Sequence, residues 1–188
     1  MSDTRFDGYV REVLKFRKAL NLTSIKDEAE FKQKFILPSL ELLNWIPQEG
    51  RVLDIGSGMG IPGVPLVIAR EGLHGVLVER RKKRAEFLRH LVRTLKLDAE
   101  VHDVDVNAVA SLKVDICVAR AVADERLLLK MCSRHANDSA VAVLPVPLSS
   151  EQVEMDDWSC VDQKEVDVHG TVQLIRCYRY CPEVSRET

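Results

Sequence analysis

The residues best suited to chemistry lie together in one short glycine-rich segment. In the stretch LDIGSGMGIPGVP, Asp54 is followed at alternate positions by Gly56, Gly58 and Gly60. Glycine lacks a Cβ atom, so a backbone with these glycines can bend sharply and approach a ligand closely. Prolines at positions 62 and 65 preset φ for the first turn of a following helix. The segment therefore predicts a ligand-binding turn before a helix, and the alternative is a tight turn without a ligand.

Two kinds of cofactor fit this segment, according to where the motif begins. Counted from Gly58, it reads GxGxxG with Glu79 about twenty residues further on, as in NAD-binding proteins. Counted from Asp54, it reads DxGxGxG, which resembles the motif of Rossmann-like S-adenosylmethionine-dependent methyltransferases. The NAD-binding interpretation leaves Asp54 unpaired in a buried strand, at a cost of several kcal/mol, so the methyltransferase interpretation is favoured. In either case Glu79 can accept hydrogen bonds from both ribose hydroxyls.

The segment around the glycines alternates between short apolar runs and helical stretches. The apolar runs predict strands at 52–55, 76–78, 114–118 and 141–144, and the stretches between them predict helices at 64–70, 82–95 and 124–135. Such alternation is typical of a parallel sheet covered by helices on both faces. Two further runs, at 159–166 and 171–180 around His169-Gly170, predict an antiparallel hairpin. Because ligands of such sheets bind beyond the carboxyl ends of the strands, the glycine segment lies where a cofactor is expected.

The first 46 residues are expected to form a helical extension to this core. Residues 5–20 carry apolar side chains at amphipathic helical spacing. Ser24 with Asp27 resembles the start of a second helix, which Pro38 must kink or restart before Trp45. We therefore expect a single α/β domain over residues 1–188, with a helical N-terminal extension at 1–46 and a Rossmann-like core at 47–188.

Composition is that of a globular cytoplasmic protein. Apolar residues make up 46% and charged residues 30% of the 188 residues, and no apolar run reaches the roughly 20 residues that a membrane helix needs. The five cysteines are odd in number and form no CxxC pair, so neither a disulfide framework nor a metal site is predicted. We expect a monomer without a membrane partner.

Four segments of the chain resemble the RsmG family, also called GidB, of guanine-N7 methyltransferases that act on small-subunit (16S) ribosomal RNA. They are NLTS at 21–24, LDIGSGMGIPGVPL at 53–66, KRAEFL at 83–88 and the pair Arg120-Ala121. The resemblance covers roughly residues 9 to 135, and the GIPG continuation and the KRxxFL helix make it much more specific than the glycines alone.

The resemblance implies a class I methyltransferase fold, S-adenosyl-L-methionine as cofactor, S-adenosyl-L-homocysteine as product, no metal, and ribosomal RNA or the small-subunit particle as partner. It implies that Arg120 faces the cofactor and the substrate as the catalytic residue. The residues that it implies for cofactor binding are Asp54, Gly56, Ser57, Gly58, Gly60, Glu79, Asp105, Val106 and Asn107, the last three bordering the adenine. From residue type alone, Arg120 can hold a guanine or a phosphate by its planar fork, or pair with a carboxylate at a strand end.

The chain departs from the family pattern on the substrate side. Where the family has HILDS, this chain has FILPS, with Phe35 and Pro38 replacing a histidine and an aspartate. The family's RxE, which an acidic residue follows, becomes Asp105-Val106-Asn107-Ala108, and its LKG becomes Leu144-Pro145-Val146. These changes leave two alternatives open: a divergent methyltransferase for another substrate, and a non-catalytic RNA- or protein-binding domain that keeps the fold.

Charge is distributed unevenly along the chain. Residues 1–98 contain 18 Lys+Arg and 13 Asp+Glu (+5), whereas residues 99–188 contain 9 and 16 (−7). The segment 80–96 alone carries eight Lys+Arg and one acidic residue, Glu86. Such a helix can track RNA phosphates, and the alternative is a solvated outer face. Guanine N7 has a free lone pair and no proton to remove, so methyl transfer there requires orientation rather than a strong base.

Overall fold

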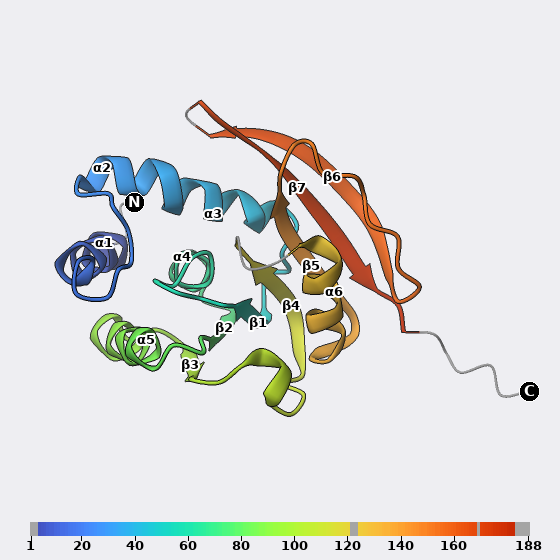
Figure 1. Ribbon diagram of the computed structural model, residues 1–188, viewed down its shortest axis with the longest axis horizontal. Helices are drawn as coiled ribbons and strands as arrows, with labels where there is room; N and C mark the ends of the chain where they lie inside the picture. Colours follow the sequence, from blue (N-terminus) through green and yellow to red (C-terminus); the bar gives the residue numbers. More distant parts are fainter. Residues whose placement is uncertain (1–3, 121–123, 169, 183–188) are drawn as a thin grey trace, which may run out of the picture.

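The computed structural model describes residues 4–120, 124–168 and 170–182 (Figure 1). Ala121 of the family pair and His169 of the hairpin lie outside the described residues. Seven strands form one sheet in the order β3-β2-β1-β4-β5-β7-β6. They are β1 (Gly50–Ile55), β2 (Leu73–Val78), β3 (Ala99–His102), β4 (Val114–Ala119), β5 (Ala136–Val146), β6 (Trp158–Val168) and β7 (Thr171–Tyr180).

The first five strands pair in parallel, and β7 is antiparallel to both β5 and β6. This topology confirms the predicted α/β fold with a mostly parallel sheet and a C-terminal antiparallel hairpin. The apolar pattern does not predict β3, because every residue of this edge strand is half-exposed and two of the four, Glu100 and His102, are polar or charged. The strand beside it, β2, is nearly all buried and conforms to the pattern.

Helices cover both faces of the sheet (Figure 1). On one face α4 (Gly63–Ala69) and α5 (Lys82–Leu95) pack with α1 (Thr4–Phe16) in one apolar cluster. On the other face α6 (Glu125–Ser133) and the short 3-10 helix η3 (Val106–Ala108) pack against the alternate side chains of β1, β2 and β4. The bounds of α5 equal the predicted 82–95. Among the described residues, no helix has the length and apolarity needed to cross a membrane.

The N-terminal extension is helical, as predicted, but its helices begin and end elsewhere. The first helix ends at Phe16 rather than at Leu20. The proposed start at Ser24 is wrong: Asp27 caps α2 (Glu28–Phe31), its carboxylate accepting the Glu30 N–H at 2.8 Å. A cap must lie directly before the first helical turn, and Ser24 is too early for that.

The helix changes form next to Pro38, in agreement with the predicted kink or restart: a new α-helical segment begins at Leu37, with Pro38 in its first turn. The chain continues from α2 through a π-helical turn, η1 (Lys32–Ile36), into α3 (Leu37–Glu41) and the 3-10 turn η2 (Leu42–Asn44). Within η1 the Leu37 N–H donates to the Lys32 carbonyl, five residues back. Proline has no N–H, so Pro38 cannot donate to the carbonyl of Lys34, four residues before it. That carbonyl therefore does not receive the usual α-helical bond from position 38.

Candidate functional site

The chain leaves β1 through the glycine loop and enters α4 at the carboxyl edge of the sheet. Gly58 and Gly60 have φ of +56° and +99°, a region that residues with a Cβ rarely adopt. At Gly60 the local packing also excludes a side chain, because a Cβ would lie 2.6 Å from Val64 Cγ2 of α4. The DxGxGxG pattern is therefore required by the backbone path and by close contact with the next helix.

Asp54 is completely buried at the end of β1, under the N-terminus of α4. Its Oδ2 accepts the Gly63 N–H at 3.1 Å, and a Cβ on Gly63 would lie 2.8 Å from the same oxygen. Its Oδ1 is buried and has no hydrogen-bond partner among the described residues. Burial raises the pKa of Asp54 to about 7. The Gly63 N–H and the Ser57 side chain act in the opposite direction, and the nearby charge of Glu79 adds to the rise. The unpartnered oxygen fits a site that receives a cationic ligand group.

Glu79 lies just beyond the end of β2 and is held by the backbone of both neighbouring loops. Its Oε2 accepts the Gly58 N–H at 3.0 Å, and its Oε1 accepts the Arg81 N–H at 2.8 Å. These two bonds fix the carboxylate beside the glycine loop while leaving it further lone pairs. Glu79 can therefore accept hydrogen bonds from a ligand without moving.

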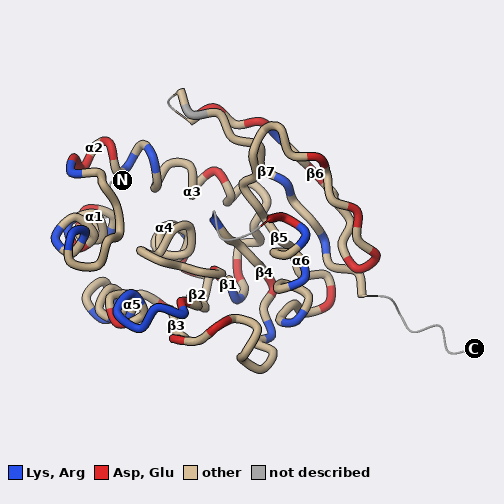
Figure 2. Tube along the Cα trace, in the orientation of Figure 1, with Lys and Arg blue, Asp and Glu red and all other residues tan. Residues whose placement is uncertain are grey.

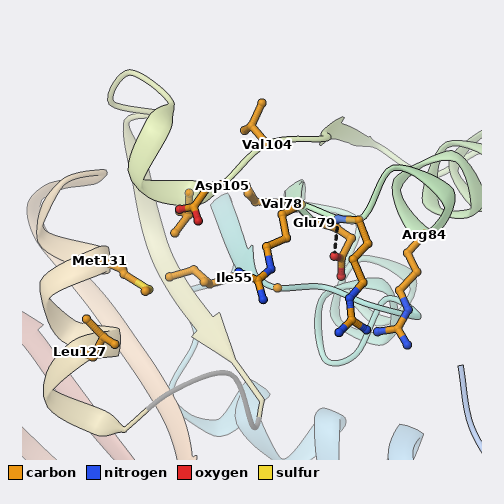
Figure 3. A pocket seen from close by; sticks show the side chains of 12 residues that line it. Ile55, Val78, Glu79, Arg84, Val104, Asp105, Leu127 and Met131 are labelled. Atoms are coloured by element: carbon orange, nitrogen blue, oxygen red, sulfur yellow. Dashed lines mark hydrogen bonds between the residues drawn. The ribbon is translucent and has the colours of Figure 1, made fainter. Parts of the chain in front are cut away.

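A cavity of about 420 Å³ opens beside Glu79 (Figure 3). This volume is in the range of small-molecule sites. Leu127 and Met131 approach from α6 on one side, and Glu79 and Arg84 lie on the other. The full lining consists of Ile55, Gly56, Val78, Glu79, Arg80, Arg81, Arg84, Val104, Asp105, Val106, Leu127 and Met131. The cavity thus combines apolar walls with two carboxylates, those of Glu79 and Asp105, and three arginines.

The segment after β3 forms the far wall of this cavity. Asp105 Oδ1 accepts the Asn107 N–H at 2.8 Å and its side-chain amide at 3.1 Å. Asn107 is exposed and does not line the cavity, so its contribution is to orient Asp105. The buried His135 anchors the segment, because its Nε2 lies 3.0 Å from the Val106 carbonyl and its Nδ1 accepts the Leu112 N–H at 3.3 Å. These partners require a neutral ring, and burial lowers the pKa of His135.

Arg120 follows β4 and lies apart from the cavity. Its guanidinium carbon lies 4.9 Å from the centre of the Phe35 ring, and both terminal nitrogens donate to the Lys34 carbonyl at 3.3 Å. This is the carbonyl four residues before Pro38, to which the proline cannot donate. Arg120 forms no salt bridge with a carboxylate among the residues described, so a pairing with a strand-end acid is not found there.

The structure thus brings most of the sequence-derived site residues to one edge of the sheet. Gly56, Glu79, Asp105 and Val106 line the cavity, whereas Asp54, Ser57 and Gly60 are buried behind it. Ser57 Oγ donates to the Asp54 carbonyl at 2.8 Å and so stiffens the loop. Sequence reasoning missed the residues that reach the site from elsewhere, which are Tyr9, Gly63, Arg81, Arg84, Leu127 and Met131. Three of them carried a signal in the sequence: Gly63 belongs to the GIPG continuation, Arg84 to the KRAEFL motif, and Arg81 with Arg84 to the basic segment 80–96.

The described residues contain the parts that an adenosine cofactor with an ammonium group requires. Asp54 Oδ1 is an unpartnered acceptor, Glu79 is a fixed carboxylate at the second strand, and the apolar wall from Val104 to Met131 suits an adenine ring. No group of three or more His, Cys, Asp or Glu side chains suited to a metal ion occurs within residues 4–120, 124–168 and 170–182.

Comparison with known proteins agrees with this geometry. Residues 3–172 match the family GidB, described as rRNA small subunit methyltransferase G. Curated relatives named "Ribosomal RNA small subunit methyltransferase G" include those of Chloroflexus aggregans, 35% identical over 133 residues, and Roseiflexus castenholzii, 38% identical over 133 residues. These alignments cover 67% of this chain and 56% and 57% of the relatives, so the chain spans little more than half of their length.

Solved structures share the fold at low sequence identity. A mutant of MtNAS in complex with S-adenosylmethionine has a TM-score of 0.65 and 17% identity, covering 96% of this chain and 73% of that one. The putative methyltransferase yhhF from Escherichia coli has a TM-score of 0.61 and 16% identity, covering 77% of this chain and 84% of that one. The family match extends over nearly the whole described chain, and the sheet order and the glycine site are consistent with it. The chain therefore belongs to the GidB family of rRNA small subunit methyltransferase G proteins.

Proposed function

We propose that this protein is an S-adenosylmethionine-dependent methyltransferase that modifies a guanine N7 of small-subunit ribosomal RNA. The observation that carries the proposal is the pair of acidic groups at the carboxyl edge of the sheet: Asp54 with a buried oxygen that has no partner among the described residues, and Glu79 with its carboxylate fixed by two backbone amides. Membership of the GidB family supports the RNA substrate.

Different residues would bind different parts of the cofactor. Asp54 would hold the ammonium group, and the loop at Gly56, Gly58 and Gly60 would pack under the aminoacyl part. Glu79 would accept both ribose hydroxyls. Asp105 and the Val106 backbone would border the adenine, whose faces would contact the apolar wall that includes Leu127 and Met131. When bound, the cofactor supplies an electrophilic methyl group on a sulfonium centre.

The remaining task of the protein is to orient the acceptor. Guanine N7 attacks through a lone pair and loses no proton, so no general base is required. Holding N7 in line with the methyl group lowers the barrier through proximity, by up to several kcal/mol. Arg120 would contribute as a fixed cation that contacts the base or a neighbouring phosphate, since its guanidinium is oriented by Phe35 and by the Lys34 carbonyl.

The charge distribution favours RNA on one side of the molecule (Figure 2). The basic residues of α5 begin beside the cavity, which Arg81 and Arg84 line, whereas β6 at the far edge of the sheet carries acidic residues. Lys82 and Lys83, in the first turn of α5, are exposed. Release of counterions from RNA phosphates would favour an approach over α5, and repulsion would disfavour an approach over β6.

Calorimetric titration with S-adenosylmethionine, S-adenosylhomocysteine and NAD tests the cofactor assignment. We expect saturable binding of the first two, none of NAD, and strongly weakened binding by Asp54→Ala. Binding of NAD alone would refute the proposal. The identity of the acceptor is tested by incubating isolated small-subunit particles, and separately their naked RNA, with cofactor labelled in the methyl group. N7-methylguanine is then mapped by base-specific strand cleavage.

The RNA face is tested by comparing two charge-reversal variants of equal size. Lys82→Glu with Lys83→Glu changes α5, and Arg126→Glu with Lys130→Glu changes α6, next to the acidic hairpin. We expect the first pair to weaken RNA binding at least ten-fold and to reduce its salt dependence, and the second pair to have little effect. Equal losses in both variants would show that net charge, and not the α5 face, governs binding.

A methyltransferase acting on another acceptor is the second candidate. It is favoured by Phe35 and Pro38, which stand where the family has a histidine and an aspartate. The Phe35 ring faces the Arg120 guanidinium, which donates to the Lys34 carbonyl, so neither polar side chain of the family pattern is present beside Arg120. Cofactor binding together with labelled product from total cell RNA, but none from the small-subunit particle, would decide for this candidate.

A further inference from the structure

A row of aromatic side chains runs through the N-terminal extension, beneath the glycine loop. Tyr9 of α1 meets Phe31 of α2 edge-on, with ring centres 5.9 Å apart, and Phe31 meets Phe35 of η1 at 4.9 Å. Tyr9 and Phe31 are completely buried. Because aromatic rings in contact pack with defined geometry, a displacement of one ring constrains its neighbours.

Both ends of this aromatic row contact the candidate site. At one end the Tyr9 hydroxyl donates to the Met59 carbonyl at 3.0 Å, between Gly58 and Gly60 of the glycine loop. At the other end the Phe35 ring lies under the Arg120 guanidinium, 4.9 Å from its central carbon. The contacts of α1, α2 and η1 thus reach both the loop proposed to bind the cofactor and the arginine proposed to face the acceptor.

The electrostatics of Tyr9 agree with this placement. Burial raises the pKa of the Tyr9 hydroxyl well above its ordinary value, the charge of Asp54 raises it further, and the charge of Arg120 opposes this. The hydroxyl therefore remains protonated and is a permanent donor to Met59. Its electrostatic coupling to Asp54 and Arg120 places it between the two halves of the site.

We propose that Tyr9 and Phe35 are positioning residues, through which the N-terminal extension fixes the glycine loop and Arg120 respectively. The inference rests on the proposed methyltransferase function for its catalytic readout. Tyr9 acts on cofactor affinity because the loop binds only in the conformation that the hydroxyl stabilises. Phe35 acts on the acceptor because its ring holds the Arg120 guanidinium in one plane, together with the Lys34 carbonyl.

Three conservative variants separate positioning from general packing. Tyr9→Phe keeps the ring and its contact with Phe31 but removes the hydroxyl. Phe35→Leu removes the ring under Arg120. Phe16→Leu is the matched control, because the Phe16 ring packs against Phe87 and His90 of α5 and, among the described residues, makes no ring-to-ring contact with a member of the row. Each variant is tested at a temperature well below its unfolding transition.

We expect Tyr9→Phe to raise the dissociation constant of S-adenosylhomocysteine about five-fold, the usual effect of one lost hydrogen bond, with the KM for RNA unchanged. We expect Phe35→Leu to leave cofactor affinity unchanged and to lower kcat/KM for RNA about ten-fold. Phe16→Leu should change neither quantity. A purely structural role would instead lower the melting temperature in all three variants without this division between cofactor and acceptor, and that result would overturn the inference.

Hydrogen exchange in the unliganded protein separates this inference from the proposed function. The Gly60 and Ile61 amides donate to the Ser57 carbonyl within the loop, at 2.6 and 3.2 Å. Tyr9→Phe should lower their protection about five-fold relative to the wild type, whether or not the protein binds S-adenosylmethionine. Unchanged protection refutes the role of Tyr9. Reduced protection in a protein that binds neither cofactor nor product refutes the proposed function alone.

Discussion

Replacing Asp54 by asparagine should make the stability of the unliganded protein much less dependent on pH. Burial raises the pKa of Asp54 from 3.8 to about 7 in the folded protein. The folded state therefore holds a proton that the unfolded state releases near pH 4, so stability falls as pH rises from 4 to 7. At about 1.4 kcal/mol per pKa unit, the buried carboxyl group lowers the free energy of unfolding by about 4 kcal/mol above pH 7 and by about 1–2 kcal/mol at pH 5.

The free energy of unfolding of Asp54→Asn, relative to that of the wild type, should consequently rise by about 3 kcal/mol from pH 5 to pH 8. Asparagine fits the same space, and its amide oxygen can still accept the Gly63 N–H. Its amide nitrogen is left without a partner, which costs about 1–3 kcal/mol at every pH. That constant cost cancels when the two pH values are compared, as does the titration of His135, which both proteins share.

Thermal unfolding of both proteins at pH 5 and pH 8 measures this change. For a chain of this size, about 3 kcal/mol corresponds to about 6–12 °C, so the melting temperature of Asp54→Asn should rise by that amount relative to the wild type. A difference that stays constant within 2 °C would mean that Asp54 is already ionised at pH 5 and would refute the reasoning. Binding of a cationic ligand group has the opposite pH dependence, because it favours the ionised carboxylate. Wild-type affinity for S-adenosylhomocysteine should therefore be about ten-fold weaker at pH 6 than at pH 8.

Three further predictions follow from single contacts. Arg176→Met should lower the free energy of unfolding, measured by chemical denaturation, by about 3–5 kcal/mol. The reason is that the buried Glu125 carboxylate, which lies 2.7 Å from the Arg176 guanidinium, would lose its cation. Arg176→Lys keeps a cation and should cost less. Protection of the Leu112 amide from hydrogen exchange should fall as pH drops below 6.5, because protonation of His135, whose pKa is lowered, removes the acceptor. The control is His135→Gln, which should show no such fall. Gly60→Ala should lower the melting temperature and weaken cofactor binding at least ten-fold, because φ is +99° and the Cβ collides with α4; unchanged titration curves would contradict this.

The sequence predicts those parts of the fold whose pattern is set by local burial. The helix α5 matches its predicted bounds because its apolar stripe is long and uninterrupted. The first helix ends at Phe16, before its apolar pattern does, because the chain turns back through Asn21, which has φ of +50°. An apolar stripe records which residues are buried, and it does not record where the backbone turns.

For the site, the sequence predicts the groups that lie at the ends of neighbouring parallel strands, and it misses those that come from distant elements. Asp54 and Glu79 follow from the loop and from the next strand, which any parallel sheet brings to the same edge. Tyr9 lies 50 residues before Met59, and nothing in its neighbourhood distinguishes it from an ordinary core tyrosine. Met131 belongs to the apolar face of α6, where its exposure to a cavity depends on tertiary packing alone.

The departures from the family pattern look independent in the sequence, at positions 35, 38 and 145, but the fold joins them around one side chain. Pro38 has no N–H to donate to the Lys34 carbonyl, Arg120 donates to that carbonyl, and the Phe35 ring faces the guanidinium. Pro145 lines the same small hollow as Pro38 and Arg120. These positions form one environment for Arg120, so the proposed role of Arg120 toward an acceptor depends on the three residues together and not on the loss of any single polar group.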